Sequence, residues 1–361
     1  MKAVIPAAKK KESLFPFSDS KPTALMPVKG EPLISQTIDK LKIQGVTEVY
    51  VVVNYREEMF RELFEDREDV NIVRQEELSG TAEALKTVDF IEEDFIVVNS
   101  DVVISENDIG KLIDSHEGDL SMLATDEKKA EKFGVLSIQN DEIVSIEEKP
   151  ENPDNSLINS GIYILKPEIF SLLEESDKSS LTKVINENIE DLDCRFKLIE
   201  DYWIDIGSPK KLWKADQVLR ENELEPGISE DAEISDKASI GENVNIGEKV
   251  KVEDGAIIKG ETIVCKNTAV GPNTVIENST IGPNSQLENC HIQDSLLFEE
   301  NIVDSFVDLE NVVFGEECDV KSGSVVKESF IGPRSYIDMN NSIRGVKFVP
   351  DARTDLSEIS K

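Results

Sequence analysis

The sequence predicts two domains of different classes: an α/β domain with a mostly parallel sheet, followed by a left-handed parallel β-helix. Residues 1 to about 220 alternate short β-rich runs with helical patterns, whereas from Gly227 onward aliphatic residues recur every six positions. A length of 361 residues also exceeds that of one minimal domain. We place the domains at residues 1–222 and 227–345, with a tail at 346–361.

The first domain alternates strands and helices along the chain. The apolar run Ala3-Val4-Ile5 predicts its first strand, and residues 49–53, 70–73 and 95–98 predict three more. Apolar residues recur at helical spacing between these strands, and Ser105 is expected to cap the helix that follows the last of them. Strands alternating with helices imply βαβ units, and therefore a Rossmann-like, mostly parallel sheet.

The second domain contains nine consecutive hexads in one phase. Each aliphatic position is followed four residues later by a small or short residue, which is the pattern of a left-handed β-helix with three hexads per coil. The spacing falls to about five residues after Ile276 and recovers at Ile331, so we expect less regular later coils, with bulges or a partner-facing surface. The nine aliphatic positions are Ile228, Ile234, Ile240, Ile246, Val252, Ile258, Val264, Val270 and Ile276.

The composition argues against several functions. The 74 acidic and 39 basic residues give a formal charge of −35, which disfavours nucleic acid or an anionic membrane as the partner. The four cysteines lie far apart and only two histidines occur, so the sequence favours buried free thiols over a zinc site. No apolar stretch resembles a signal peptide or a membrane span, and we expect a soluble, cytoplasmic protein.

Two aspartates stand in distinctive contexts. Asp101 ends the stretch Val97-Val98-Asn99-Ser100-Asp101, and Asp205 lies within Trp203-Ile204-Asp205-Ile206-Gly207. Open α/β sheets bind ligands at the carboxyl ends of their strands. Two carboxylates together with substrate phosphates are a usual arrangement for Mg²⁺. Either aspartate alone would read as a turn or cap residue.

Four further groups of residues complete a pattern in a fixed order. The first stretch runs from Gln75 through Gly80 and Thr81 to Ala82. The other elements are Phe133-Gly134-Val135, Glu148-Lys149-Pro150 and Asn159-Ser160-Gly161-Ile162-Tyr163. Read alone, the first stretch is a strand that runs into a helix capped near Gly80. The later three read as turns between strands, with a hairpin tip at Asp141-Glu142.

Together these motifs resemble the sugar-phosphate nucleotidylyltransferases, and the resemblance spans nearly the whole chain. These enzymes join a sugar 1-phosphate to a nucleoside triphosphate and release pyrophosphate and an NDP-sugar. The resemblance implies base and nucleotide contacts from Gln75, Gly80 and Thr81. It implies Mg²⁺ binding by Asp101 and Asp205, although the family's glycine before the first aspartate is a serine here. On the sugar side it implies a phosphate contact from Lys149 and sugar contacts from Gly134, Glu148 and Asn159.

The loop after the first strand departs from the family. Its relatives carry L-A-A-G-x-G-T-R-L-x-P followed by P-K-P, in which glycines let backbone amides wrap the triphosphate and the two cations neutralise it. Ala7 and Ala8 keep the nucleotide-binding start of this loop. Four decisive positions have changed: Lys9 and Lys11 replace the glycines, Ser13 the arginine and Thr23 the lysine.

These changes predict impaired transfer. Losing one such contact costs on the order of 10²–10³ in rate, and Glu12 adds negative charge where the triphosphate is expected. Lys9, Lys10, Lys11 or Lys21 could stand in as mobile point charges, or the lysine run could be a solvated turn.

Three functions therefore compete. The leading one is a family member that binds sugar nucleotide or sugar phosphate with most transfer activity lost, as a regulatory subunit of an active paralogue. The second is an active, Mg²⁺-dependent enzyme with a rewired loop. The third is a β-helix acyltransferase on an amino sugar that uses His291, the one histidine of the repeat region. We expect a homo-oligomer or a complex with the paralogue.

Overall fold

The structure is a computed structural model, and it describes residues 1–78, 80–140, 142–176 and 180–354. Asp141, expected at a hairpin tip, and residues 355–361 of the expected tail lie outside the described residues. By packing, the chain forms two units: Met1–Lys10, Pro22–Leu25 and Leu33–Asp205 make an α/β unit, and Lys11–Lys21, Met26–Pro32 and the chain from Ile206 make a β-helix unit. This division differs from the expected boundary at residue 222.

The α/β unit is built on a mixed sheet that has nine strands within the described residues, in the order β5-β4-β1-β6-β11-β8-β12-β10-β9. The four strands from β5 to β6 run parallel, as the sequence predicts. Beyond β6 most neighbours are antiparallel, so the parallel arrangement covers only the first half of the sheet. The strands are β1 (Lys2–Pro6), β4 (Glu48–Val53), β5 (Val70–Arg74), β6 (Phe95–Val98), β8 (Leu120–Asp126), β9 (Gly134–Gln139), β10 (Glu142–Glu148), β11 (Leu157–Leu165) and β12 (Cys194–Leu198).

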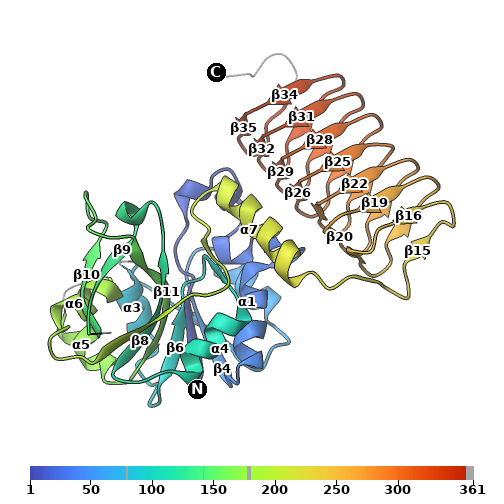
Figure 1. The fold of residues 1–361 in the computed structure, drawn as a ribbon. Helices are drawn as coiled ribbons and strands as arrows, with labels where there is room; N and C mark the ends of the chain where they lie inside the picture. Colours follow the sequence, from blue (N-terminus) through green and yellow to red (C-terminus); the bar gives the residue numbers. More distant parts are fainter. Residues whose placement is uncertain (79, 141, 177–179, 355–361) are drawn as a thin grey trace. The chain divides into compact units, whose positions relative to one another are not determined.

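Helices cover both faces of this sheet, and each face has its own apolar core (Figure 1). Ser105 caps α4 as predicted, because its side chain accepts a hydrogen bond from the Asp108 backbone amide. One face carries α3 (Thr81–Lys86), α5 (Ile169–Glu175) and α6 (Leu181–Glu187); the other carries α1 (Leu33–Ile43), α2 (Glu57–Leu63) and α4 (Glu106–Asp114). Short 3₁₀ turns are η1 (Glu12–Leu14), η2 (Phe17–Asp19), η3 (Thr23–Leu25) and η4 (Ala130–Lys132).

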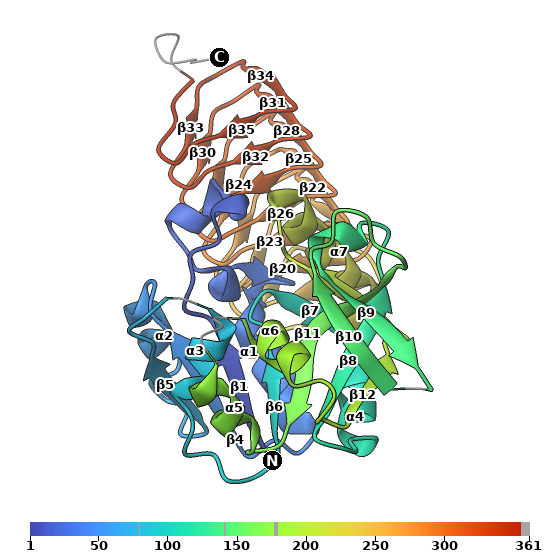
Figure 2. The ribbon, with the colours of Figure 1, turned by 90° about the vertical axis from the view of Figure 1, so that its left-hand side faces the viewer.

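The β-helix unit stacks short parallel strands into three sheets, which agrees with the predicted left-handed β-helix (Figure 2). The first sheet, called the covered sheet below, contains β14 (Gly227–Ile228), β17 (Val244–Ile246), β20 (Thr262–Val264), β23 (Thr280–Ile281), β26 (Leu296–Leu297), β29 (Val313–Phe314), β32 (Phe330–Ile331) and β35 (Lys347–Phe348). The second contains β15 (Glu233–Ile234), β18 (Lys251–Val252), β21 (Ala269–Val270), β24 (Gln286–Leu287), β27 (Ile302–Val303), β30 (Asp319–Val320) and β33 (Tyr336–Ile337). The third contains β16 (Ser239–Ile240), β19 (Ile257–Lys259), β22 (Val275–Glu277), β25 (His291–Gln293), β28 (Asp308–Glu310), β31 (Val325–Lys327) and β34 (Ser342–Arg344).

The change of sequence period after Ile276 shortens the coil. Gly227 pairs with Asn245 in an early coil, whereas Thr280 pairs with Leu296 in a later one. The strand pairs of this unit show no shift of register over the described residues, so the expected bulges are not found there. The coil also continues past residue 346, because β35 pairs with β32.

One sheet of the β-helix is covered by chain from elsewhere in the same unit. Thr280, Leu296 and Val313, on the covered sheet, are 0% exposed. Helix α7 (Pro209–Glu223) reaches this sheet through Trp213, whose Nε1 donates to the Asp294 carbonyl at 2.7 Å. The short strand β2 (Pro27–Val28) packs against α7 and pairs with β3 (Glu31–Pro32).

A buried polar cluster ties these covering segments to the sheet. The Asp216 carboxylate, 0% exposed, accepts hydrogen bonds from the Lys29 backbone amide at 2.8 Å and from the Thr280 hydroxyl at 2.8 Å. Arg220 Nε donates to the same carboxylate at 2.9 Å. A buried charge is tolerated when it is paired and hydrogen-bonded in this way.

The cysteines are free thiols, as the sequence predicts, and Cys194, Cys290 and Cys318 are buried. Burial raises the pKa of each of these thiols to about 12. Within the described residues, no helix has the length and apolar character needed to cross a membrane.

Candidate functional site

The two predicted metal ligands lie on a two-stranded ribbon at the carboxyl end of β6. Strand β7 (Val102–Ile104) pairs antiparallel with β13 (Trp203–Asp205), and Asp205 lies opposite Val102. Asp101 directly precedes Val102, so the register brings the two aspartates together from positions far apart in the sequence. Both aspartates are partly exposed, which leaves them accessible to a ligand.

Asp101 and Asp205 suit a metal ion whose remaining ligands come from the substrate. No three Asp, Glu, His or Cys side chains gather closely enough to hold a metal among the described residues. Two carboxylates from the protein are what Mg²⁺ uses when phosphate oxygens and water supply its remaining ligands. The donor set at Asp101 and Asp205 is therefore compatible with Mg²⁺ bound together with a phosphorylated substrate.

The sugar-side residues Gly134, Glu148 and Lys149 lie on one hairpin. Glu148 pairs with Gly134 across β10 and β9, and a methyl group on Gly134 would lie 3.2 Å from Glu148 Oε2. The Lys149 backbone amide donates to the Phe133 carbonyl at 2.9 Å. The Lys149 side chain is 66% exposed and its Nζ lies 3.9 Å from Glu148 Oε1, so its cation is available to an anionic ligand.

Asn159, the fourth sugar-side residue, is held in a defined orientation. Its Oδ1 accepts a hydrogen bond from the Gly161 backbone amide at 2.9 Å, and its Nδ2 donates to the Tyr163 hydroxyl. Thr182 is a further hydrogen-bonding partner of the Tyr163 side chain. Burial raises the pKa of Tyr163, so the phenol stays protonated.

The base-side residues are engaged in local hydrogen bonds. Gln75 is 3% exposed, and its Nε2 donates to the carbonyls of Glu77 at 2.7 Å and Gly80 at 3.3 Å. The Thr81 hydroxyl accepts a bond from the Leu181 amide at 3.2 Å. The Gln75 amide therefore organises its own loop, and its role in reading a base stays a prediction.

The start of the first loop is bound to the sheet. The Ala7 amide donates to the Val52 carbonyl at 2.7 Å, and the Ala8 carbonyl accepts from the Tyr55 amide at 3.1 Å. Lys9 is exposed, and Lys10 Nζ lies 5.9 Å from the centre of the Tyr55 ring. Of the lysines considered as substitutes for the missing cations, these two belong to the α/β unit.

The rest of that loop packs on the β-helix. Residues 11–21 belong to the β-helix unit, and Figure 2 shows their short turns, in dark blue, beside its coils. Phe17 is 0% exposed, and its ring centre lies 5.4 Å from that of Phe298 at the end of β26. Lys21 forms an ion pair with Glu299 and lies 3.9 Å from Glu316. Lys11, Ser13 and Lys21 therefore belong to the β-helix unit, whereas the sugar-side and metal residues belong to the α/β unit.

Thr23, in the position of the family's lysine, belongs to the α/β unit and is 5% exposed. Its hydroxyl oxygen is buried without a hydrogen-bond partner.

Sequence reasoning missed three residues that organise the site. Trp203 Nε1 donates to the Ser160 carbonyl at 3.0 Å, and the indole packs edge-on against Phe133 at 5.6 Å. Trp203 lies in the same motif as Asp205, and Tyr163 lies in the same motif as Asn159. Their closeness to these candidate residues could have marked them as part of the site. Thr182 lies in an ordinary helical pattern, and no local signal marks it.

Both domains match known protein families. Residues 2–222 match the family model described as nucleotidyl transferase, and residues 225–345 match one described as the GMPPB C-terminal domain. A bifunctional sugar-1-phosphate nucleotidylyltransferase/acetyltransferase from Sulfurisphaera tokodaii is 30% identical over 387 residues, which cover 98% of this chain and 95% of that protein.

Other relatives match the first domain. The bifunctional protein GlmU of Methanocaldococcus jannaschii is 30% identical over 226 residues, covering 61% of this chain and 54% of that protein. The chain thus spans about half the length of the GlmU relatives that it matches. The UTP–glucose-1-phosphate uridylyltransferase AglF of Haloferax volcanii is 32% identical over 239 residues, covering 61% of this chain and 97% of that protein.

A crystal structure supports the fold. It is of a protein assigned as a glucose-1-phosphate thymidylyltransferase from Bacillus anthracis, in complex with sucrose. The TM-score is 0.57 and the identity 24%, and the match covers 63% of this chain and 97% of that one. At this identity the likeness establishes the α/β fold and carries no statement about substrate.

Proposed function

Because the chain belongs to the nucleotidyl transferase family, we propose that it binds a sugar 1-phosphate or an NDP-sugar but has lost most transfer activity. The observation that carries this proposal is the sequence and packing of the first loop. Four of its decisive positions have changed, and residues 11–21 pack on the β-helix through Phe17 and Lys21. The sugar-side and metal residues, in contrast, lie together in the α/β unit.

The proposed metal is Mg²⁺, held by Asp101 and Asp205. A bound Mg²⁺ would offset the negative charge of the substrate phosphates. Lys149 would add a cation beside the sugar phosphate, while Asn159 and Glu148 would orient the sugar hydroxyls. Binding by these groups does not require the missing phosphate cradle, so affinity and turnover can be lost separately.

Turnover assays combined with loop restoration test this proposal. The purified protein is assayed for NDP-sugar formation from each nucleoside triphosphate and a panel of sugar 1-phosphates, with binding followed by thermal shift. The variant Lys9→Gly, Lys11→Gly, Ser13→Arg, Thr23→Lys is assayed in parallel. We expect ligand-induced stabilisation of both proteins and turnover above background only in the restored variant. Turnover of the unmodified protein at ordinary enzyme rates, about 1–10³ s⁻¹, would overturn the proposal.

The same assay addresses an active enzyme with a rewired loop. Lys9 and Lys10, which belong to the α/β unit, are the observation that favours this alternative. It predicts Mg²⁺-dependent turnover that is lost in Asp101→Asn and in Asp205→Asn. Turnover that survives both substitutions would count against it.

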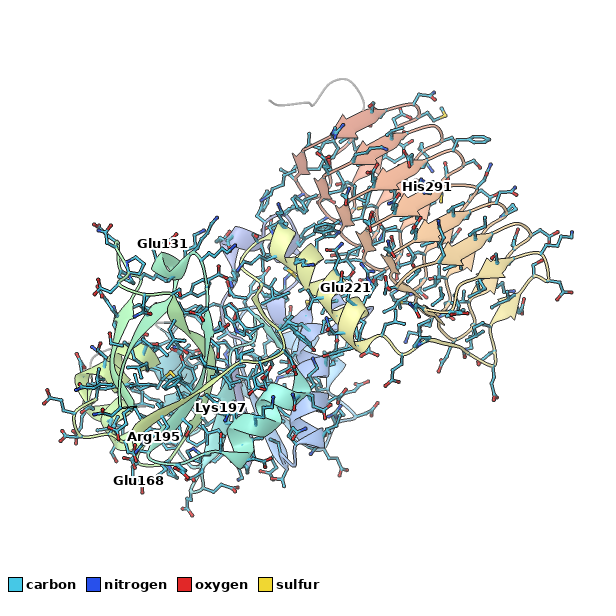
Figure 3. The ribbon with its side chains drawn as sticks, in the orientation of Figure 1. Glu131, Glu168, Arg195, Lys197, Glu221 and His291 are labelled. Atoms are coloured by element: carbon cyan, nitrogen blue, oxygen red, sulfur yellow. The ribbon has the colours of Figure 1, made fainter. Side chains whose placement is uncertain are left out.

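An acetyltransferase in the β-helix is a second candidate, because the Sulfurisphaera relative that matches over nearly the full chain is named for both activities. His291 lies on β25, where Figure 3 labels it, and its Nδ1 lies 2.9 Å from Asp308 Oδ1. A carboxylate can orient a histidine that acts as a base. This candidate predicts acetyl transfer from acetyl-CoA to an amino sugar phosphate that disappears in His291→Ala.

The proposed assembly is a homo-oligomer or a complex with an active paralogue, to which the chain would act as a regulatory subunit. Sedimentation analysis of the purified chain tests the first possibility. Co-purification with the active family member from the same cells, and a change in that enzyme's turnover on mixing, tests the second.

A further inference from the structure

Residues 159–161 touch both segments that carry the predicted metal ligands. The Ser160 carbonyl accepts a hydrogen bond from Trp203 Nε1 at 3.0 Å, two residues before Asp205. The Gly161 carbonyl accepts one from the Asn99 backbone amide at 3.0 Å, two residues before Asp101. One short stretch of β11 therefore contacts the approach to each aspartate.

This stretch is also where β11 is irregular. The register with β8 passes from the pair Asn159–Ala124 to the pair Tyr163–Met122, so the residues between bulge out of the ladder. Gly161 has a φ of +82°, and a methyl group there would collide with the Asn99 side-chain amide. Glycine adopts this conformation without steric cost, whereas a side chain at position 161 would be strained.

The sugar side reaches the same stretch through Asn159. The Asn159 side chain hydrogen-bonds the Gly161 amide and the Tyr163 hydroxyl, so its orientation and that of the Gly161 peptide depend on each other. A ligand that reorients the Asn159 amide must therefore act on the peptide that Asn99 contacts.

We infer that residues 159–161 form a positioning joint that couples the sugar-phosphate side of the site to the two metal aspartates. This inference rests on the proposed function. A sugar 1-phosphate that reorients the Asn159 amide shifts the Ser160 and Gly161 carbonyls, and these shift the segments leading to Asp205 and Asp101. Sugar phosphate and divalent metal then each raise the affinity for the other, by the same factor, because linkage is reciprocal.

Metal titrations test the coupling without any need for turnover. Mn²⁺ serves as the probe ion, and its binding is followed by electron paramagnetic resonance with and without glucose 1-phosphate or N-acetylglucosamine 1-phosphate. For the unmodified protein we expect the sugar phosphate to tighten Mn²⁺ binding about tenfold, within the usual range for coupled sites.

Two tryptophans supply a matched pair of variants. Trp203→Phe keeps a ring against Phe133 but removes the donor to Ser160, and we expect the coupling to fall to about twofold or less. Trp213→Phe removes the same kind of bond, to the Asp294 carbonyl in the β-helix unit, and should leave the coupling unchanged.

Two glycines supply a second pair. Gly161→Ala places a methyl group against Asn99, whereas Gly45→Ala has almost the same φ, +85°, and nothing within 4 Å of its methyl group. Both substitutions carry the same backbone strain, but only Gly161→Ala should abolish the coupling. If Gly161→Ala does not fold, the Mn²⁺ titration of Trp203→Phe alone tests the coupling.

The outcomes separate the two proposals. If Trp203→Phe and Gly161→Ala fold and keep the full coupling, the joint is wrong while the proposed function stands. If the unmodified protein binds Mn²⁺ and sugar phosphate without mutual effect, the joint is equally wrong. If it binds neither sugar phosphate, the proposed function fails and the inference falls with it.

Discussion

The first loop and the strand ends around β6, β11 and β13 carry parts of one resemblance, yet they follow it to different degrees. At the strand ends, Asp101, Asp205 and Asn159 match the residue types that the resemblance implies, and hydrogen bonds join their neighbouring residues. In the loop, Lys9, Lys11 and Ser13 stand where the resemblance implies glycines and an arginine, and Phe17 and Lys21 pack within the β-helix unit.

The two regions also pack in different units. The strand ends belong to the α/β unit, whereas residues 11–21 belong to the β-helix unit, where Phe17 contacts Phe298 and Lys21 pairs with Glu299. Because their packing partners are separate, we expect a substitution in one region to leave the packing of the other unchanged. Each of the following predictions tests one side of the comparison.

The largest effect is expected for Phe17→Ala. Phe17 is fully buried against Phe298, and truncating a buried phenylalanine costs about 3–5 kcal/mol in the free energy of unfolding. Denaturant unfolding of the purified variant measures this cost. The control is Phe306→Ala, because Phe306 is 73% exposed and should change stability little. A loss below about 1 kcal/mol at Phe17 would show that the loop does not pack as described.

A smaller effect is expected for Lys21→Met. This change keeps the apolar stem but leaves Glu316, whose side chain is 9% exposed, without its cation. Because Glu299 is more exposed and stays solvated, we expect a loss of about 1–3 kcal/mol, below the range for a fully buried pair. Lys237→Met, which removes an exposed pair with Asp254, should have no measurable effect. Equal results for the two lysines would contradict the anchoring role of Lys21.

On the other side of the comparison, Tyr163→Phe removes the hydroxyl that holds Asn159. We expect the affinity for sugar 1-phosphate to fall by about threefold to tenfold, the worth of one hydrogen bond. Calorimetric titration measures the affinity. Tyr336→Phe, a change within the β-helix unit, is the control. Unchanged affinity in Tyr163→Phe would mean that Asn159 needs no support from the phenol.

The smallest effect is expected for Thr23→Val. The Thr23 hydroxyl is buried without a hydrogen-bond partner, so replacing it with a methyl group should leave stability unchanged or raise it by about 1 kcal/mol or less. Ligand binding should also stay the same. A tenfold loss of sugar-nucleotide affinity would instead assign this hydroxyl a contact with the ligand.

The sequence predicts the β-helix well because its pattern is local and repeated. Interior positions such as Ile258 and Val264 are 0% exposed, as the hexads require, whereas Ile228 in the first coil is 53% exposed because no earlier coil covers it. Helix α4 and its Ser105 cap are readable for the same reason, since a cap lies next to the helix it serves.

Contacts between distant parts of the chain could not be predicted from the pattern. The sequence around Phe17 gives no indication that its ring packs against Phe298. The buried Asp216–Arg220 pair has the same helical spacing as an ordinary surface ion pair, so its burial could not be predicted. The mixed half of the sheet escaped prediction because strand order is set by pairing across the sheet and not by the alternation of elements. The metal and sugar-side motifs could be located in the sequence. The hydrogen bonds that connect them could be seen only in the structure.

The packing of residues 11–21 on the β-helix also sets an order of events during synthesis. Lys21 and its partner Glu299 are 278 positions apart. At about 5–20 residues per second, a ribosome needs roughly 15–60 s to bridge that interval. Leu14 and Phe17 are fully buried in the folded protein, but they do not reach this buried state until then. The nascent chain is thus exposed to aggregation for most of its translation, and chaperones have a defined apolar stretch to protect.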